Sequence, residues 1–282
     1  MSRNFFSDIL AQKREEVAQI KSDSSSSRLH EHALEIRRTA VPHRLVEALK
    51  SESPRLKIIA ELKRISPSAG ILRADISPGE VARQYEGGGA CAISVVTDES
   101  HFGGSLADLR AVRSNTNLPI LRKDFIIDVI QIYEAAIAGA DAVLLIAAAV
   151  DDRLLRELRE VAEDDLGLDA LVEVHTSEEL RRALNAGAKI IGVNNRDLQT
   201  FRISLSTSER LIAEAPRDRI MISESGLQSA KSLRNLQTLG FRGFLIGEAL
   251  MRSNEPETAL RRLLTGADDL EPHALSIAPR QS

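Results

Sequence analysis

The chain has 282 residues, of which 43% are hydrophobic and 28% are charged, and its formal net charge is −4. These values are ordinary for a globular protein with a large core, and the negative charge and the low aromatic content of 3% argue against nucleic acid or an anionic membrane as a partner. Because the sequence has one cysteine, Cys91, no run of about 18 apolar residues and no signal-peptide pattern, we expect a cytoplasmic protein without an intramolecular disulfide.

Residues 1–50 form the first predicted unit, a helical extension. In residues 1–21 the apolar side chains are spaced as on one face of a helix. They are Phe6, Ile9, Leu10, Val17 and Ile20. The serine tract Ser24–Ser27 ends this helix, and a second polar and apolar stretch continues to about Lys50. The sequence leaves two roles open for the extension: packing across one end of the following domain, or covering a bound substrate.

Eight short apolar runs recur between residues 51 and 265, each bounded by a stretch with helical patterning, such as Ser77–Gly88 and Ser177–Asn185. The runs are Lys57–Lys63, Cys91–Thr97, Pro119–Lys123, Asp141–Ala147, Asp169–His175, Lys189–Asn195, Arg219–Ser225 and Gly243–Ala249. This repeat predicts an α/β protein of the (β/α)8 TIM-barrel class, with residues 51–265 as the barrel. Residues 266–282 contain two prolines and are expected to be a loosely ordered tail.

In this architecture the carboxyl ends of the strands build the active site, so polar residues there are candidates for catalysis. Side chains alternate along a strand, and Glu61 and Lys63 therefore share one face of the first strand with Ile59. Because helices cover the opposite face, we expect Glu61 and Lys63 to point into the barrel. The alternative is a buried ion pair without another role, although such pairs often give no net gain in stability.

The third strand ends at Lys123, and the fifth places Glu173 on its inward face. Two ammonium groups in one cavity, those of Lys63 and Lys123, are expected to lower each other's pKa, which suits acid catalysis or an anionic substrate. Burial is expected to raise the pKa of Glu173 and make it a proton donor or acceptor. His175 has the same parity and is interpreted as a residue of the rim.

The last three strands end in groups that suit an anion. The sixth offers the amide of Asn194 and the guanidinium of Arg196, which can hold a carboxylate or a phosphate. The seventh ends next to Gly226 and the eighth contains Gly247, where backbone N–H groups can approach a phosphate. The sequence has no ligand pattern for a metal and no dinucleotide-binding fingerprint after the first strand, so we expect no cofactor.

Two further loops could contact a substrate. The loop Ser66–Gly70 extends from the first strand and could fold over the substrate, although a plain turn is the alternative. Phe102 and Phe125, in the second and third loops, lie at the right level to sandwich an aromatic ring. Packing in the core or in a cap would explain the two phenylalanines almost equally well.

In combination, these residues resemble the indole-3-glycerol phosphate synthase family. The matching segments span residues 57–251 and read IIAELKRISPSAG, AISVVTDESHFGGS, PILRKDFI, LVEVH, IGVNNRDL, SESG and FLIGEALM. The segment FFSDILAQKREEVAQIK resembles the family's helical extension. Two departures are slight: Asn195 follows Asn194, and Glu248 stands where some relatives carry serine. The second departure leaves a backbone N–H available to a phosphate.

The resemblance implies a phosphorylated small-molecule substrate, 1-(2-carboxyphenylamino)-1-deoxyribulose 5-phosphate, which is closed to indole-3-glycerol phosphate with loss of carbon dioxide and water. Lys123 would be the general acid of ring closure, while Glu173, Glu61 and Lys63 are all candidates for the dehydration. The residues that the resemblance assigns to catalysis are Lys123, Glu173, Lys63, Glu61, Asn194 and Ser225. Those assigned to substrate binding are Arg196, Phe102, Phe125, Leu144, Ser66 and Glu224, and those assigned to the phosphate are Ser225, Gly226, Gly247 and Glu248.

Two other functions stay open at this point. Another phosphate-binding barrel enzyme, such as an isomerase of phosphorylated ribose derivatives, would share the two glycines but would not explain the lysines and glutamates together. A non-catalytic relative that binds a sugar phosphate would have no need of Lys123 or Glu173. In each case we expect a monomer or a weak homo-oligomer.

Overall fold

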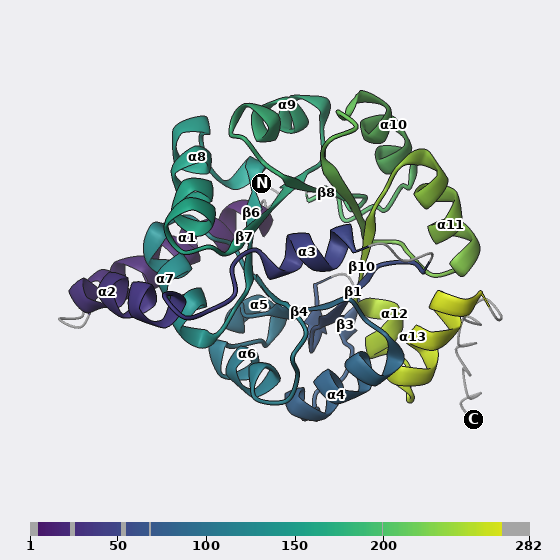
Figure 1. Ribbon diagram of the computed structural model, residues 1–282, viewed down its shortest axis with the longest axis horizontal. Helices are drawn as coiled ribbons and strands as arrows, with labels where there is room; N and C mark the ends of the chain where they lie inside the picture. The colour runs from purple at the N-terminus through teal and green to yellow at the C-terminus, as the bar shows by residue number, and fades with distance from the viewer. Residues whose placement is uncertain (1–4, 23–25, 52–54, 68, 199, 267–282) are drawn as a thin grey trace, which may run out of the picture.

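The computed structural model describes residues 5–22, 26–51, 55–67, 69–198 and 200–266. Its centre is a closed barrel of parallel strands in the hydrogen-bonded order β1-β10-β9-β8-β7-β6-β5-β4 (Figure 1). The strands are β1 (Ile58–Leu62), β4 (Ala92–Val96), β5 (Ile120–Lys123), β6 (Ala142–Ile146), β7 (Asp169–Val174), β8 (Ile190–Asn194), β9 (Ile220–Glu224) and β10 (Gly243–Ile246). Each lies within one of the predicted runs, so the predicted (β/α)8 barrel is confirmed. The predicted tail lies, apart from Gly266, outside the described residues.

Helices surround the barrel on its outer side (Figure 1). They are α4 (Pro78–Gly88), α6 (Leu106–Arg113), α7 (Val129–Ala138), α8 (Asp152–Glu160), α9 (Ser177–Asn185), α10 (Ser206–Glu214), α11 (Ala230–Leu239) and α13 (Pro256–Thr265). Most of them begin behind a side-chain cap, which satisfies one of the free N–H groups at a helix start. Ser77, for example, accepts a hydrogen bond from the N–H of Glu80. The caps and the apolar spacing together explain why these helices lie close to their predicted bounds.

The barrel strands separate an outer from an inner apolar layer. In β1, Ile58, Ala60 and Leu62 pack in the outer layer against the helices. Ile59 packs in the inner layer, inside the barrel. Glu61 has the parity of Ile59 and is buried, so it points into the barrel as the alternation predicts.

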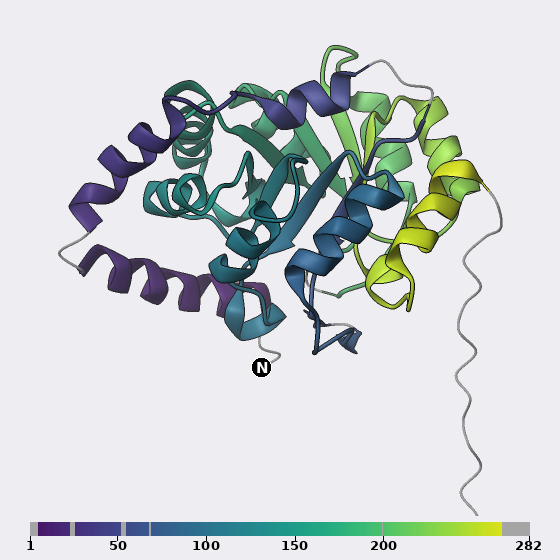
Figure 2. The same cartoon turned by 60° about the horizontal axis from the view of Figure 1, so that its bottom comes forward.

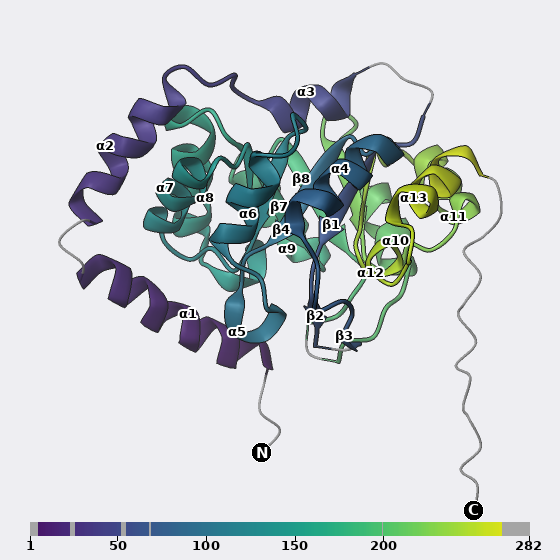
Figure 3. The ribbon, with the colours of Figure 1, turned by 90° about the horizontal axis from the view of Figure 1, so that it is seen from below.

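The N-terminal extension consists of α1 (Phe5–Ser22), α2 (Ser26–Arg37) and α3 (Arg44–Lys50). Helix α3 lies across one end of the barrel, whereas α1 lies at the opposite end, near the hairpin strands β2 (Ile65–Ser66) and β3 (Gly70–Ile71) (Figure 3). Helix α2 lies between α1 and α3 in the chain and packs against α7 along the side of the barrel (Figure 2). Leu45 and Leu49 of α3 belong to the inner apolar layer, so α3 closes the amino-terminal end of the barrel.

Asp169, the first residue of β7, holds α3 in this position. The residue before α3, His43, has a φ of 52° and provides no side-chain cap. Instead, Asp169 Oδ2 accepts hydrogen bonds from the N–H groups of Leu45 at 2.8 Å and Val46 at 2.9 Å. The carboxylate of the barrel thus replaces the missing cap at the N-terminus of α3.

Replacing Asp169 with alanine is expected to lower the free energy of unfolding by about 2–5 kcal/mol, because each buried N–H left without an acceptor costs about 1–3 kcal/mol. Urea denaturation followed by circular dichroism measures the change. The matched control is Asp218→Ala, at an exposed aspartate, for which we expect a change within about 0.5 kcal/mol. Equal changes in the two variants would contradict the capping role.

Several short elements have no counterpart in the sequence predictions. They are the hairpin strands β2 (Ile65–Ser66) and β3 (Gly70–Ile71), helix α5 (Glu99–Phe102) and helix α12 (Glu248–Met251). The predicted eighth run, Gly243–Ala249, is wrong at its end, because β10 stops at Ile246 and Gly247 precedes α12. A helix of one turn is too short to show helical periodicity, and Ala249 and Leu250 only prolong the apolar pattern of the strand.

Candidate active site

A pocket at the carboxyl ends of the barrel strands brings together every residue that the sequence assigned to a site. From the strands and the segments directly after them come Glu61, Lys63, Lys123, Leu144, Glu173, Asn194, Arg196, Glu224, Ser225 and Gly226. From the loops and short helices come Ser66, Phe102, Phe125, Gly247 and Glu248. The structure tests their placement in one pocket, while their individual roles remain proposals.

Glu61 and Lys63 form an ion pair inside the pocket, with 2.7 Å between Lys63 Nζ and Glu61 Oε1. Burial alone would raise the pKa of Glu61, but the charges of Lys63 and Lys123 outweigh burial and hold the pKa below its usual value. A Cβ at Gly247 would lie 2.4 Å from Glu61 Oε1, so the carboxylate occupies space that only a glycine leaves open. The carboxylate of Glu61 on β1 therefore packs directly against the turn after β10.

Lys123 lies among carboxylates. Its Nζ is 3.2 Å from Glu173 Oε2 and 3.6 Å from Glu224 Oε2. Burial alone would lower the pKa of Lys123, but Glu173, Glu224 and Glu61 outweigh burial and raise the pKa above its usual value. The lowering expected from two neighbouring ammonium groups is therefore outweighed at Lys123, whose net pKa shift is upward. The reason is that three glutamates surround it, while Lys63 is paired with Glu61.

The pKa values of Glu224 and Glu173 are shifted in opposite directions. Burial, followed by the repulsion of Glu173 and Glu61, raises the pKa of Glu224 to about 8 in spite of Lys123. Both side-chain oxygens of Glu224 are buried and accept no hydrogen bond from the described part of the chain. The pKa of Glu173 is instead lowered: burial would raise it, but Lys123 and His175 outweigh burial. Burial acts on Glu173 as expected, but the net shift of its pKa is downward, whereas that of Glu224 is upward.

His175 was interpreted from the sequence as a residue of the rim. In the structure its ring contacts two glutamates. Its Nε2 is 3.4 Å from Glu173 Oε1, and its Nδ1 is 3.0 Å from Glu179 Oε2. Burial lowers the pKa of His175, but the two glutamates, together with Glu224, outweigh burial and raise it. His175 thus contacts Oε1 of Glu173, whereas Lys123 contacts Oε2.

The loops after β8 and β9 are joined by hydrogen bonds. Asn194 Oδ1 accepts from Ser225 Oγ at 2.8 Å and from the N–H of Arg196 at 2.9 Å. Ser225 and Gly226 have φ values of 67° and 75°, so the chain turns sharply at the end of β9. A non-glycine residue at positive φ is uncommon and is often found at functional sites. Arg196 Nη2 lies 3.6 Å from Glu248 Oε2, which links the loop after β8 to α12.

Replacing Glu224 with glutamine is expected to raise the melting temperature at pH 8 more than at pH 5. The pKa of this carboxyl is about 4.3 in the unfolded chain, whereas it is about 8 in the folded protein. Stability is therefore unaffected by this group below the unfolded pKa, falls as the pH rises towards the folded pKa, and stays lowered above it. Glutamine cannot ionise, so the variant does not lose stability as the pH rises.

Thermal unfolding of both proteins at the two pH values measures the effect. The control is Glu178→Gln, at an exposed glutamate of α9, which should change the melting temperature little at either pH. A gain for Glu224→Gln that is equal at pH 5 and pH 8 would contradict the raised pKa.

Comparison with known proteins identifies the family. A family model described as indole-3-glycerol phosphate synthase matches residues 6–263. The chain belongs to the indole-3-glycerol phosphate synthase family. The indole-3-glycerol phosphate synthase of Chloroherpeton thalassium is 46% identical over 251 residues, which cover 88% of this chain and 95% of that protein. That of Carboxydothermus hydrogenoformans is 45% identical over 265 residues, covering 92% of this chain and 99% of that protein.

Solved structures of more distant proteins share the fold of this indole-3-glycerol phosphate synthase family member. Thiamine phosphate pyrophosphorylase from Pyrococcus furiosus has a TM-score of 0.54 and 17% identity, covering 74% of this chain and 93% of that chain. KGPDC from Streptococcus mutans has a TM-score of 0.56 and 16% identity, covering 74% of this chain and 95% of that chain. At this level of identity the likeness concerns the barrel fold alone.

Several apolar residues of the pocket in this family member were not predicted from the sequence. Helix α1 contributes Phe5, Phe6 and Ile9, and the loop after β8 contributes Leu198, Phe201 and Ile203. A signal for them exists: the chain has only seven phenylalanines, and two of them are adjacent at the start of the predicted first helix. Among the described residues, no cluster of His, Cys, Asp and Glu could hold a metal ion, and no helix is both long and apolar enough to span a membrane.

Proposed function

We propose that this protein converts 1-(2-carboxyphenylamino)-1-deoxyribulose 5-phosphate to indole-3-glycerol phosphate, releasing carbon dioxide and water, as a step of tryptophan biosynthesis. Family membership supports a lyase that acts on a phosphorylated small molecule. The observation that carries the proposal is the presence of two lysine–glutamate pairs in one pocket, Lys123 with Glu173 at 3.2 Å and Lys63 with Glu61 at 2.7 Å. Each pair places a proton donor beside a proton acceptor, and the reaction has two steps that need such groups.

The phosphate is proposed to bind after β9 and β10. TIM barrels often bind phosphate at the loops after the seventh and eighth strands and at the start of a short extra helix, the position that α12 occupies here. The N–H groups near Gly226, Gly247 and Glu248 and the hydroxyl of Ser225 are the proposed donors. The carboxylate of Glu248 is turned to Arg196, so only its backbone N–H is assigned to the phosphate.

The aromatic ring is proposed to lie on the other side of the pocket, among Phe102, Phe125 and Leu144. The centroids of Phe102 and Phe125 are 6.1 Å apart, at an angle of 37° between the rings. The carboxylate on the ring needs a cation and a hydrogen-bond donor until it leaves, and Arg196 and Asn194 are assigned to it. Ser66, in the hairpin after β1, is assigned to the edge of the same pocket.

Ring closure is assigned to Lys123. The ring carbon that bears the carboxylate attacks the ketose carbonyl carbon, and the carbonyl oxygen takes a proton from Lys123 to become a hydroxyl. The surrounding carboxylates keep Lys123 protonated until the substrate arrives, and Glu173 holds its ammonium in place. Breakage of the bond to the carboxylate then releases carbon dioxide, and its electron pair restores the aromatic ring.

Dehydration is assigned to the Lys63–Glu61 pair. The hydroxyl leaves as water with a proton from Lys63, and Glu61 accepts the proton lost from the methylene carbon next to the nitrogen. Lys63 and Glu61 are in contact, so the proton can return from the carboxylate to the amine after each turnover. The overall reaction consumes one proton, the one that Lys123 donates and regains from the solvent.

The purified protein incubated with the carboxyphenylamino substrate tests this function. We expect indole fluorescence to appear together with an equal amount of carbon dioxide. Conversion of the substrate without carbon dioxide would favour a phosphate-binding isomerase. Binding of the substrate without conversion would favour a non-catalytic relative.

A further inference from the structure

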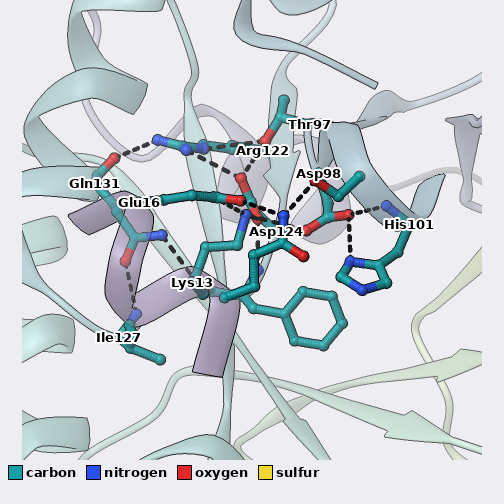
Figure 4. Close-up of polar contacts among 12 residues, drawn as sticks. Lys13, Glu16, Thr97, Asp98, His101, Arg122, Asp124, Ile127 and Gln131 are labelled. Carbon is teal, nitrogen blue, oxygen red and sulfur yellow. Dashed lines mark hydrogen bonds and ion pairs between the residues drawn. The ribbon is translucent and has the colours of Figure 1, made fainter. Parts of the chain in front are cut away.

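Helix α1 carries a buried positive charge that the mechanism does not use. Lys13, in the middle of α1, has a side chain that is 5% exposed. Its Nζ lies 3.0 Å from Asp124 Oδ1, 3.1 Å from Asp98 Oδ2 and 2.7 Å from Glu16 Oε2 of the same helix (Figure 4). Lysine is almost never fully buried unless it is paired, so the two aspartates hold this side chain at the barrel.

Asp124 is fixed independently of α1. It directly follows Lys123, and its Oδ1 accepts the N–H of Phe125 at 2.8 Å. Its Oδ2 accepts from Arg122 at 3.0 Å and from the hydroxyl of Thr97 at 2.6 Å (Figure 4). Asp124 is thus a rigid anchor for Lys13, and the anchor belongs to the segment that carries Phe125.

Asp98 is fixed to another wall of the pocket. It precedes α5, and its Oδ1 accepts the N–H of His101 at 2.9 Å as the cap of that helix. Helix α5 ends at Phe102. Asp98 Oδ2 is buried and accepts no hydrogen bond from any described residue, and Lys13 is the cation that faces it.

The three segments that meet at Lys13 also carry aromatic side chains that meet in the pocket. The centroid of Phe125 is 6.2 Å from that of Phe6 on α1 and 6.1 Å from that of Phe102 at the end of α5. We propose that Lys13 is a positioning residue for the ring of the substrate: it ties α1 to Asp98 and Asp124 and so sets the spacing of these three phenylalanines. This inference rests on the proposed function, which supplies the aromatic ring.

The electrostatics of the cluster support this inference. Burial alone would raise the pKa of Asp124, but Arg122 and Lys13 outweigh burial and lower the pKa to about 2. The carboxylate is therefore ionised throughout the working pH range. Removing the ammonium would leave the buried Asp98 carboxylate without the cation that faces its Oδ2, and of the described residues only His101 would then contact its Oδ1, which is more costly than losing an exposed ion pair. We expect α1 to move away from the barrel in response.

The test compares two ligands in the Lys13→Met variant. Indole-3-glycerol phosphate has the ring, and glycerol 3-phosphate does not. Calorimetric titration is expected to show an affinity for the first that is about tenfold or more weaker, with KM raised in parallel and kcat within about threefold of wild type. The affinity for glycerol 3-phosphate should stay within about twofold, because its site at the ends of β9 and β10 does not touch α1.

Two further variants serve as a control and as a test of the pairing between Lys13 and Asp98. Lys21→Met removes an exposed charge from the same helix, which pairs with Asp128, and should behave as wild type towards both ligands. Asp98→Asn keeps the cap oxygen of α5 but removes the charge that faces Lys13. Combined with Lys13→Met, it should restore part of the lost ring affinity, because no buried charge is then left unpaired.

Unchanged ring affinity in Lys13→Met would overturn the inference, and so would an equal loss of affinity for both ligands. If Lys13→Met does not fold, Asp98→Asn alone should weaken the binding of indole-3-glycerol phosphate more than that of glycerol 3-phosphate, and equal effects would overturn the inference. A wild-type protein that binds glycerol 3-phosphate but forms no indole from the substrate would instead contradict the proposed function.

Discussion

Replacing Lys123 with alanine is expected to lower kcat by about 10²–10⁴-fold, the usual contribution of a positioned general acid. Alanine leaves the carbonyl oxygen without its proton donor, so ring closure becomes the slow step. The affinity for glycerol 3-phosphate is expected to stay within about twofold, because Gly226 and Gly247 follow other strands. Indole fluorescence measures turnover, and calorimetric titration measures the affinity.

The control for Lys123→Ala is Lys50→Ala, at an exposed lysine in the last turn of α3. Helix α3 closes the opposite end of the barrel, so this variant should have wild-type activity. Turnover of Lys123→Ala at the wild-type rate would end the assignment of the general acid. A parallel loss of glycerol 3-phosphate binding would mean that the pocket has changed shape, and the kinetic effect would then say nothing of proton transfer.

Replacing Lys63 with methionine is expected to separate the two halves of the reaction. Lys123 still closes the ring and carbon dioxide still leaves, but the hydroxyl departs without its acid. We expect indole formation to fall by about 10²–10⁴-fold while the first turnover still releases carbon dioxide. Single-turnover experiments with substrate labelled in its carboxylate measure the two products separately.

The control for Lys63→Met is Lys57→Met, just before the amino end of the same strand. Lys57 hydrogen-bonds Ser51 far from the mouth and should leave both products at wild-type rates. If carbon dioxide and indole fall by the same factor in Lys63→Met, the lysine acts before decarboxylation. The dehydration would then have to be assigned to Glu61 or Glu173 with another acid.

The strands and the long helices follow from local patterns in the sequence. Ile58, Ala60 and Leu62 alternate with Ile59 and Glu61, and this alternation alone indicates which side chains face the helices. The one-turn helix α12 could not be predicted, because its apolar residues continue the pattern of β10. The place of α1 at the mouth could not be predicted either, since an amphipathic helix does not specify the surface that it covers.

The composition of the site was predictable because carboxyl ends of parallel strands meet at one edge of a barrel. The pKa shifts of its buried glutamates could not be predicted from the sequence. The sequence assigned Glu173 to catalysis with a raised pKa and Glu224 to substrate binding. Only the three-dimensional arrangement shows that Lys123 and His175 lower the pKa of Glu173, while burial raises that of Glu224. The same reasoning separates Lys13 from Lys21, the exposed lysine of α1, because a sequence does not show which charges become buried.

Some expectations from the sequence stay predictions. They include the division into an extension of residues 1–50 and a barrel of residues 51–265, the monomeric or weakly oligomeric state, the cytoplasmic location and the lack of a nucleic-acid partner. The thiol of Cys91 is expected to be inert, since burial raises its pKa to about 12. None of these points changes the chemistry proposed for the pocket.

A crystal structure of the protein with indole-3-glycerol phosphate tests the central claim most directly, namely that one mouth is divided into a phosphate end and a proton-transfer end. We expect the phosphate beside the N–H groups of Gly226 and Gly247, the indole ring packed against Phe102 and Phe125, and the amine of Lys123 within reach of the newly formed ring. A phosphate bound beside Lys123 and Glu173, with the ring elsewhere, would contradict the account.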